Sequence, residues 1–220
     1  MSPSSPTVHV LKHSLAEHHL SRLRSVDTVA AQFRLHVNAL ATLLAAEVTR
    51  NLALQDCTVT TPLETVPAKE LSGRIAAIPI LRAGLGMVTP MTELIPDIEV
   101  WHLGLYRDEE TAKPVRYYDN LPPDRPTDTA IVLDPMLATG GSAVSAIETV
   151  RDWGVRDVRL MTILSAPEGI AKVTAQFPDV PIYTCAIDRE LNDRKFILPG
   201  LGDAGDRIFN TEQPDESQGR

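Results

Sequence analysis

The segment Asp134–Ser142 has the residue types and spacing best suited to chemistry in this chain. It reads Asp-Pro-Met-Leu-Ala-Thr-Gly-Gly-Ser, and it lies between a short apolar run and a stretch with apolar residues at helical spacing. Backbone N–H groups at the start of a helix form an anion site, and glycines allow a ligand to approach the backbone closely. The lysine of the P-loop is missing, and the pattern is not Gly-x-Gly-x-x-Gly. We expect a phosphate here, with the Asp134 carboxylate one loop away to accept sugar hydroxyls.

Two arginines follow predicted strands and extend this picture. Arg82 comes directly after the apolar run Ile75–Leu81, and Arg107 directly after Val100–Tyr106. Ligands of open parallel sheets bind beyond the carboxyl ends of the strands, so both arginines should lie on the same rim. Their guanidinium groups present fixed forks of N–H donors that suit a pyrophosphate. Either arginine alone is typical of a solvated surface, but their shared position favours a ligand.

The alternation of apolar runs and helical periods predicts the frame that positions these residues. Strands alternating with helices indicate βαβ units and an α/β fold, with a mainly parallel sheet flanked by helices. Residues 11–54 are expected to be helical, with Asp27-Thr28 as the capping pair of a second helix. We expect one domain over residues 1–220, with residues 1–7 and 212–220 as flexible tails.

Individual elements follow from the same patterns. The predicted strands are Cys57–Leu63 with a hairpin partner after Thr65, then Ile75–Leu81, Val100–Tyr106, Thr129–Leu133, Val158–Leu164 and Ile182–Ala186. The predicted helices of this part are Met87–Leu94, Ser142–Trp153 and Glu168–Phe177. The tyrosines Tyr106, Tyr117 and Tyr118 do not lie in a basic cluster, which disfavours stacking on nucleic acid.

The composition excludes several classes of function. The 220 residues are 43% hydrophobic and 23% charged, so a sizeable core can form. A net charge of −8 disfavours binding to duplex nucleic acid. Cys57 and Cys185 form neither a disulfide framework nor a zinc motif. No apolar run reaches the roughly 20 residues that cross a bilayer, and no signal peptide is visible, so we expect a cytoplasmic protein.

Four stretches together resemble the uracil phosphoribosyltransferases, a branch of the type I phosphoribosyltransferases. They are Pro79–Met87, Gly104–Asp108, Asp134–Ser142 and Pro199–Arg207, and they occur in the order and spacing of that family. The likeness extends from about residue 8 to residue 211. It implies that uracil and 5-phosphoribosyl 1-pyrophosphate (PRPP) give UMP and pyrophosphate. Mg²⁺ would be bound through PRPP, with no metal ligand from the chain.

The resemblance also assigns residues to the two substrates. Those expected to bind PRPP are Arg82, Arg107, Asp134, Pro135, Met136, Leu137, Ala138, Thr139, Gly140, Gly141, Ser142 and Asp203. Those expected to bind uracil are Ile197, Gly202, Asp203 and Ala204. The expected catalytic residues are Arg107, Asp134 and Asp203. Backbone groups of the glycine-rich run 200–205 can match the carbonyls and the N3–H of uracil, although such a run alone is more often a flexible loop.

Three places depart from the family pattern. Lys195-Phe196 stands where Gly-Tyr is usual, Thr89-Pro90 where Asp-Gly is usual, and Asn210 where Gly is usual. A phosphoribosyltransferase for another base, and a regulatory protein that keeps the PRPP site and binds RNA, are the alternative functions. The resemblance implies a flap hairpin or a subunit contact for the tyrosines around residues 106–118, and it implies a homo-oligomer. It leaves open whether a purine nucleotide such as GTP activates the enzyme.

Overall fold

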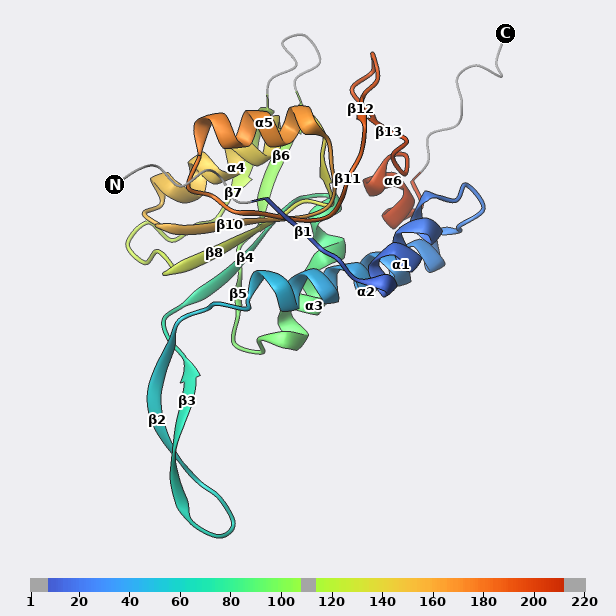
Figure 1. Ribbon diagram of the computed structural model, residues 1–220. Helices are drawn as coiled ribbons and strands as arrows, with labels where there is room; N and C mark the ends of the chain where they lie inside the picture. The colour runs from blue at the N-terminus through green and yellow to red at the C-terminus, as the bar shows by residue number, and fades with distance from the viewer. Residues whose placement is uncertain (1–7, 108–113, 212–220) are drawn as a thin grey trace, which may run out of the picture.

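A computed structural model describes residues 8–107 and 114–211 (Figure 1). The expected tails, residues 1–7 and 212–220, lie outside the described residues, as does the segment 108–113. The helices are α1 (Ser14–Arg24), α2 (Ala30–Val48), the short 3₁₀ helix η1 (Ala83–Met87), α3 (Val88–Leu94), α4 (Gly141–Asp152), α5 (Pro167–Gln176) and α6 (Ala204–Phe209). The strands are β1 (Val8–Val10), β2 (Leu54–Thr60), β3 (Thr65–Leu71), β4 (Ile75–Leu81), β5 (Glu99–Val100), β6 (Leu103–Arg107), β7 (Pro114–Asp119), β8 (Thr129–Leu133), β9 (Met136–Leu137), β10 (Asp157–Ser165), β11 (Ile182–Ile187), β12 (Glu190–Leu191) and β13 (Ile197–Leu198).

The described chain forms a nine-stranded sheet in the order β1-β11-β10-β8-β4-β6-β7, with β5 beside β4 and β9 beside β10. Strands β1, β11, β10, β8, β4 and β6 are parallel, and β7 pairs antiparallel with β6. The expected mainly parallel sheet is confirmed. Because its parallel strands end at one edge, the residues that follow β4, β6, β8 and β11 meet there.

Helices cover both faces of this sheet (Figure 1). Helices α4 and α5 lie on one face, and α1, α2 and α3 lie on the other. Neighbouring residues of β8 divide between the two cores: Ile131 packs with the α1–α3 layer and Val132 with the α4–α5 layer. All five residues of β8 are buried, as the uninterrupted apolar run of a central parallel strand requires.

The region 11–54, expected to be helical, contains α1 and α2, but α2 ends at Val48 and Leu54 already begins β2; the structure differs from expectation at three further places. Strand β1, an edge strand of three residues, was not predicted. The capping prediction for Asp27-Thr28 is wrong: Val29 is the N-cap of α2, without a side-chain hydrogen bond, and the Thr28 hydroxyl instead donates to the Arg22 carbonyl at 2.5 Å. The expected strand over 100–106 is divided into β5 and β6 by Trp101 and His102.

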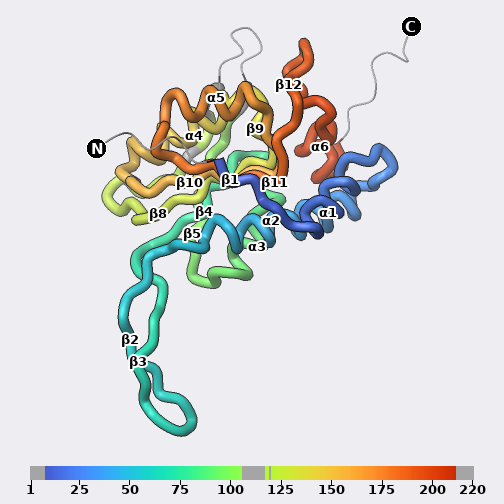
Figure 2. The backbone as a smooth tube through the Cα atoms, in the orientation of Figure 1, coloured from blue at the N-terminus to red at the C-terminus, as the bar shows by residue number. Residues whose placement is uncertain are grey.

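The two predicted antiparallel hairpins are joined to the parallel core, and β12 and β13 form a third antiparallel pair. Strands β2 and β3 pair from Leu54 with Leu71 to Thr60 with Thr65, and the hairpin projects away from the body in both views (Figures 1 and 2). Strands β6 and β7 form the second hairpin, whose turn lies outside the described residues. Both predicted hairpins are therefore present.

Candidate active site

The loop between β8 and α4 is held in its first half by the neighbouring strand. The Pro135 carbonyl accepts hydrogen bonds from the N–H groups of Ile163 and Leu164 at 3.1 and 3.0 Å. The Leu137 carbonyl accepts one from Ala166 N–H at 2.8 Å. These bonds make Met136–Leu137 a short strand beside β10 and fix where the chain turns toward α4.

The second half of the loop presents its backbone donors outward. Gly140 is the N-cap of α4, with φ of 75°, a conformation that glycine adopts without the penalty of a side chain. The N–H groups of Thr139, Gly140 and Ser142 have no hydrogen-bond acceptor in the described part of the chain. Together with the dipole of the twelve-residue helix α4, these groups can bind a phosphate.

A glycine of helix α5 sets the distance between this loop and the rest of the α4–α5 layer. A Cβ atom on Gly169 would lie 2.5 Å from the Ala138 carbonyl oxygen and 2.8 Å from that of Leu137. A Cβ atom on Gly140 would lie 2.9 Å from the Gly169 carbonyl oxygen. The loop Asp134–Ser142 and α5 therefore touch backbone to backbone, and a side chain at either glycine would push them apart.

Asp134 follows β8 and is largely desolvated. Burial raises the pKa of its carboxyl from 3.8 to about 6, because a buried negative charge loses its hydration. The N–H of Met136, which donates to Oδ1 at 3.3 Å, offsets this effect only in part. The carboxylate thus retains capacity for hydroxyl donors, such as the two on a ribose.

Arg82 lies beside the same loop, after β4 and a cis Leu81–Arg82 peptide bond. Two residues on, Gly84 packs against β8 so closely that a Cβ atom there would lie 2.4 Å from the Leu133 carbonyl oxygen. The Arg82 side chain is 57% exposed and donates to the carboxylate of Asp206 at 3.0 Å. The guanidinium group is therefore at the surface of the rim, where an incoming anion can reach it.

Arg107 is the last residue of β6, and β6 pairs in parallel with β4. The ends of the two strands are consequently neighbours, as the sequence predicted for Arg82 and Arg107. The side chain of Arg107 lies outside the part of the structure that is described.

The segment from β13 to α6 supplies the residues predicted for uracil. Ile197 and Ala204 are buried in the core of the α1–α3 layer, whereas Gly202 and Asp203 are exposed. Asp203 is the N-cap of α6, and its Oδ1 accepts from Asp206 N–H at 2.9 Å. This segment therefore presents backbone around Gly202 to solvent on the rim where Asp206 contacts Arg82.

Comparison with known proteins identifies the relationship. The profile of the uracil phosphoribosyltransferase family matches residues 10–211. The chain belongs to this family. A uracil phosphoribosyltransferase of Desulfitobacterium hafniense is 52% identical over 206 residues, covering 93% of this chain and 99% of the relative. One of Roseiflexus is 48% identical over 204 residues, covering 93% and 98%. The solved structure of the AQ2163 protein from Aquifex aeolicus has a TM-score of 0.89 at 32% identity, covering 94% of this chain and all of that chain.

Two departures from the uracil phosphoribosyltransferase pattern coincide with left-handed backbone. Lys195 has φ of 67° and Asn210 has φ of 57°, and glycine is the residue expected at both positions. Asparagine tolerates this conformation, whereas for lysine it is strained. Pro90 lies in the first turn of α3, where proline is compatible with a helix.

Several residues that shape the site were missed from the sequence. Arg24 and Asp188 form an ion pair that contacts Gly200, and Arg207 donates to the Leu201 carbonyl at 2.7 Å. Gly169 of α5 was also missed. Arg24 and Gly169 lie far along the chain from the segments that they contact, so no local spacing pointed to them. The contact of α5 with the loop Asp134–Ser142 depends on the order of the strands in the sheet, which local sequence does not give.

The site has the form of an open rim. A hollow of about 510 Å³ lies elsewhere, between β1 and α2, and is lined by residues such as His9, Lys12 and Glu47. In the described ranges, 8–107 and 114–211, no three His, Cys, Asp or Glu side chains form a group that could hold a metal ion. Among the same residues, no helix is both long and apolar enough to span a membrane.

Proposed function

We propose that this protein transfers the phosphoribosyl group of PRPP to N1 of uracil, giving UMP and pyrophosphate. Membership of the uracil phosphoribosyltransferase family over residues 10–211 carries the proposal. In the reaction the C1–O bond to pyrophosphate breaks, the C1–N1 bond forms, and the N1 proton of uracil is released. The rim of strand ends and the phosphate loop provide what this substrate pair needs: anion-binding donors, an acceptor for ribose hydroxyls and an exposed backbone for the base.

We assign the loop Asp134–Ser142 to the ribose 5-phosphate, with Asp134 accepting the ribose hydroxyls. Arg82 and Arg107 are assigned to the pyrophosphate, and Asp203 also reaches PRPP. Negative charge grows on the pyrophosphate as the C1–O bond breaks, so fixed guanidinium groups on that rim stabilise the transition state more than the ground state. The chain's contribution is therefore electrostatic and positional, without a dedicated general base.

Mg²⁺ enters this scheme as part of the substrate, bound to PRPP. Mg²⁺ commonly keeps several waters and takes its other ligands from substrate phosphates and one or two carboxylates. Asp203 can reach the Mg²⁺–PRPP complex without being a ligand of the ion: it is exposed, and its Oδ1 takes part in the helix cap. When bound, the ion would supply positive charge to the pyrophosphate, and the arginines would orient that group.

We assign uracil to the backbone near Ile197 and Gly202–Ala204. Cytosine replaces the O4 acceptor of uracil with an amino donor and turns N3 into an acceptor, so two positions become mismatched. Leaving a buried polar group unpaired costs roughly 1–3 kcal/mol. Two mismatches therefore imply a preference for uracil of about 10²–10⁴-fold in kcat/KM.

Conversion of radiolabelled uracil to UMP in the presence of Mg–PRPP tests the proposal, with cytosine and hypoxanthine as competing acceptors. Formation of UMP with the stated preference over cytosine supports it. Efficient transfer to hypoxanthine but not to uracil would assign the site to another base. Absence of transfer to any base, with RNA retained by the purified protein, would favour the regulatory alternative.

We also propose that the chain is one cytoplasmic domain that forms homo-oligomers. The projecting β2–β3 hairpin supports self-association, because its large apolar side chains Leu54, Val59 and Leu71 are exposed in the single chain. Comparing the sedimentation of the wild type with that of Val59→Asp measures self-association through this hairpin. GTP as an activator rests on the family resemblance alone, and assays with and without GTP decide it.

A further inference from the structure

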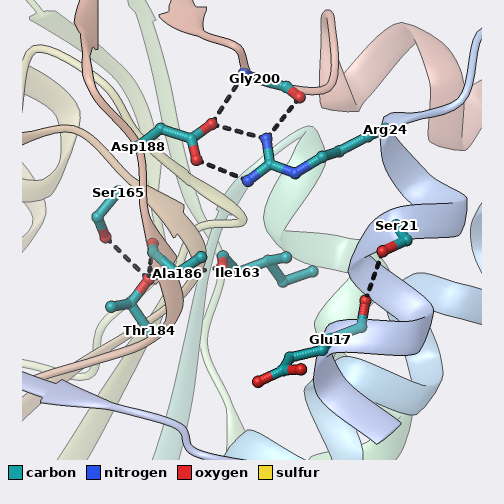
Figure 3. Close-up of polar contacts among 9 residues, drawn as sticks. All are labelled: Glu17, Ser21, Arg24, Ile163, Ser165, Thr184, Ala186, Asp188 and Gly200. Carbon is teal, nitrogen blue, oxygen red and sulfur yellow. Dashed lines mark hydrogen bonds and ion pairs between the residues drawn. The ribbon is translucent and has the colours of Figure 1, made fainter. Parts of the chain in front are cut away.

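The backbone of Gly200, in the segment assigned to uracil, is held by a pair of charged side chains from distant parts of the chain. Arg24, the last residue of α1, donates Nη1 to Asp188 Oδ2 at 2.7 Å and Nη2 to Oδ1 at 2.6 Å (Figure 3). Nη1 of the same arginine also donates to the Gly200 carbonyl at 2.9 Å. The Gly200 N–H in turn donates to Asp188 Oδ2 at 2.8 Å. Both polar groups of the Gly200 backbone are therefore bonded to this pair.

The pair is itself rigidly placed. Asp188 directly follows β11, and its N–H donates to the Ser165 carbonyl at 2.9 Å. The Ser165 hydroxyl belongs to a buried cluster with Thr184, at 3.0 Å (Figure 3). The Asp188 side chain is only 5% exposed and that of Arg24 is 26% exposed. Burial by itself would raise the pKa of Asp188, but hydrogen bonds from Arg24 and Gly200 outweigh it and lower that pKa, so the carboxylate stays charged.

The conformation of Gly200 explains why such a hold is needed. Its φ is 64°, and a Cβ atom there would lie 2.1 Å from the Ile197 carbonyl oxygen, so the chain curls back on itself. Beyond it, the Leu201 carbonyl accepts from Arg207, which also donates to the Leu23 carbonyl at 2.6 Å. The carbonyls of Gly200 and Leu201 thus point to arginines. The next two residues in the chain, Gly202 and Asp203, are exposed on the rim, and Ala204 after them is buried.

We propose that Arg24 and Asp188 are positioning residues for the base: they fix Gly200 so that the backbone of Gly202–Ala204 is oriented to accept uracil. The proposal rests on the proposed function. It predicts a loss confined to one substrate, because the loop Asp134–Ser142 is held by β10 and α5 and, among the described residues, forms no hydrogen bond with Arg24 or Asp188.

The test measures KM for uracil at saturating PRPP and KM for PRPP at saturating uracil in Arg24→Met, Arg24→Lys and Asp188→Asn. In Arg24→Met we expect KM for uracil to rise at least 10-fold, KM for PRPP to change less than about 2-fold, and discrimination against cytosine to fall. Arg24→Lys should recover part of the affinity, because one ammonium group cannot reproduce both bonds of the guanidinium fork. Arg151→Met is the matched control: Arg151 is 25% exposed and pairs with Asp179 at the far end of α4.

A purely structural role would raise both KM values together or lower only the amount of active enzyme, and either result overturns the proposal. Unchanged KM for uracil in folded Arg24→Met and Asp188→Asn overturns it as well. If Arg24→Met fails to fold, the same comparison of KM for uracil with KM for PRPP in Arg24→Lys and Asp188→Asn decides the question. Should the wild type make no UMP, the proposed function fails separately. Hydrogen exchange of the 197–204 amides then still reports whether Arg24 and Asp188 fix this segment. Faster exchange in the Arg24 and Asp188 variants, but not in Arg151→Met, supports that role. Equal exchange in all proteins refutes it.

Discussion

Replacing Asp134 with asparagine should make the protein more stable and a poorer binder of PRPP. The buried carboxyl has a pKa of about 6 against 3.8 as its ordinary value. A raised carboxyl pKa means that the folded state holds its proton more tightly than the unfolded state. Its contribution to stability is thus fully present below about pH 3.8 and is lost as the pH rises through about 6.

The size of the effect follows from the two values. A shift of about two units, at about 1.4 kcal/mol per unit, makes the ionised group cost about 3 kcal/mol at pH 7.5. At pH 5 the same linkage relation gives a cost of about 1.6 kcal/mol, because about nine-tenths of the folded population is protonated at that pH. Asparagine has no such ionisation. The advantage of Asp134→Asn over the wild type should therefore grow by about 1–1.5 kcal/mol between these pH values.

Urea unfolding of both proteins at pH 5 and pH 7.5 measures this difference, and the pH dependence of all other groups cancels in the comparison. An equal difference at the two pH values would refute the burial argument. The second readout is KM for PRPP, which should rise because an amide can accept at only one oxygen where a carboxylate accepts at two. A stabilised variant with wild-type KM for PRPP would leave the burial argument standing and refute the assignment of Asp134 to the ribose.

Substitutions at three further positions address separate parts of the structure. Gly169→Ala should raise KM for PRPP at least 10-fold and leave KM for uracil nearly unchanged, because the added methyl group would displace the Ala138 carbonyl. Steady-state kinetics measure both values, and a wild-type KM for PRPP would show that this contact does not shape the PRPP site. Lys195→Gly should stabilise the fold by about 0.5–1 kcal/mol, since relief of left-handed strain of roughly 1–2 kcal/mol exceeds the entropic cost of glycine of roughly 0.5–1 kcal/mol. A melting temperature of Lys195→Gly at or below that of the wild type would contradict the argument from backbone strain. Arg107→Ala should lower kcat more than it raises KM for PRPP, and Arg107→Lys should restore only part, so equal kcat in all three proteins would remove Arg107 from the transition state.

The sequence predicts the parts of this molecule that are encoded locally. The buried strand Thr129–Leu133 and the helix after Gly140 follow from apolar runs and glycine placement, and the structure has both. The helix cap at Asp27-Thr28 could not be predicted correctly, because the Thr28 hydroxyl is bonded to the Arg22 carbonyl of the preceding turn. Competing acceptors of this kind depend on how the chain reverses between helices, which residue type alone does not determine.

The candidate site shows the same limit. Arg82 and Arg107 could be placed on one rim because parallel strands end at one edge. The contact of Arg24 with Asp188 joins residues that are 164 positions apart, and only the packing of α1 beside the end of β11 brings them together. Roles carried by the family resemblance, such as uracil binding near Gly202, remain predictions that the kinetics above will test.

The two segments that we assign to the substrates share strand β10 but are otherwise held by different layers. The loop Asp134–Ser142 is held by β10 and α5, whereas the segment around Gly200 is held by Asp188, which is bonded to Ser165 of β10, and by Arg24 and Arg207, which join it to the end of α1. Acceptor preference can consequently vary through substitutions in the N-terminal helices while the sugar-phosphate half of the site stays as it is. The same division makes the distance between sugar and base sensitive to sliding of α1 over the sheet, so changes in packing far from either substrate can alter how well the two reactants are aligned.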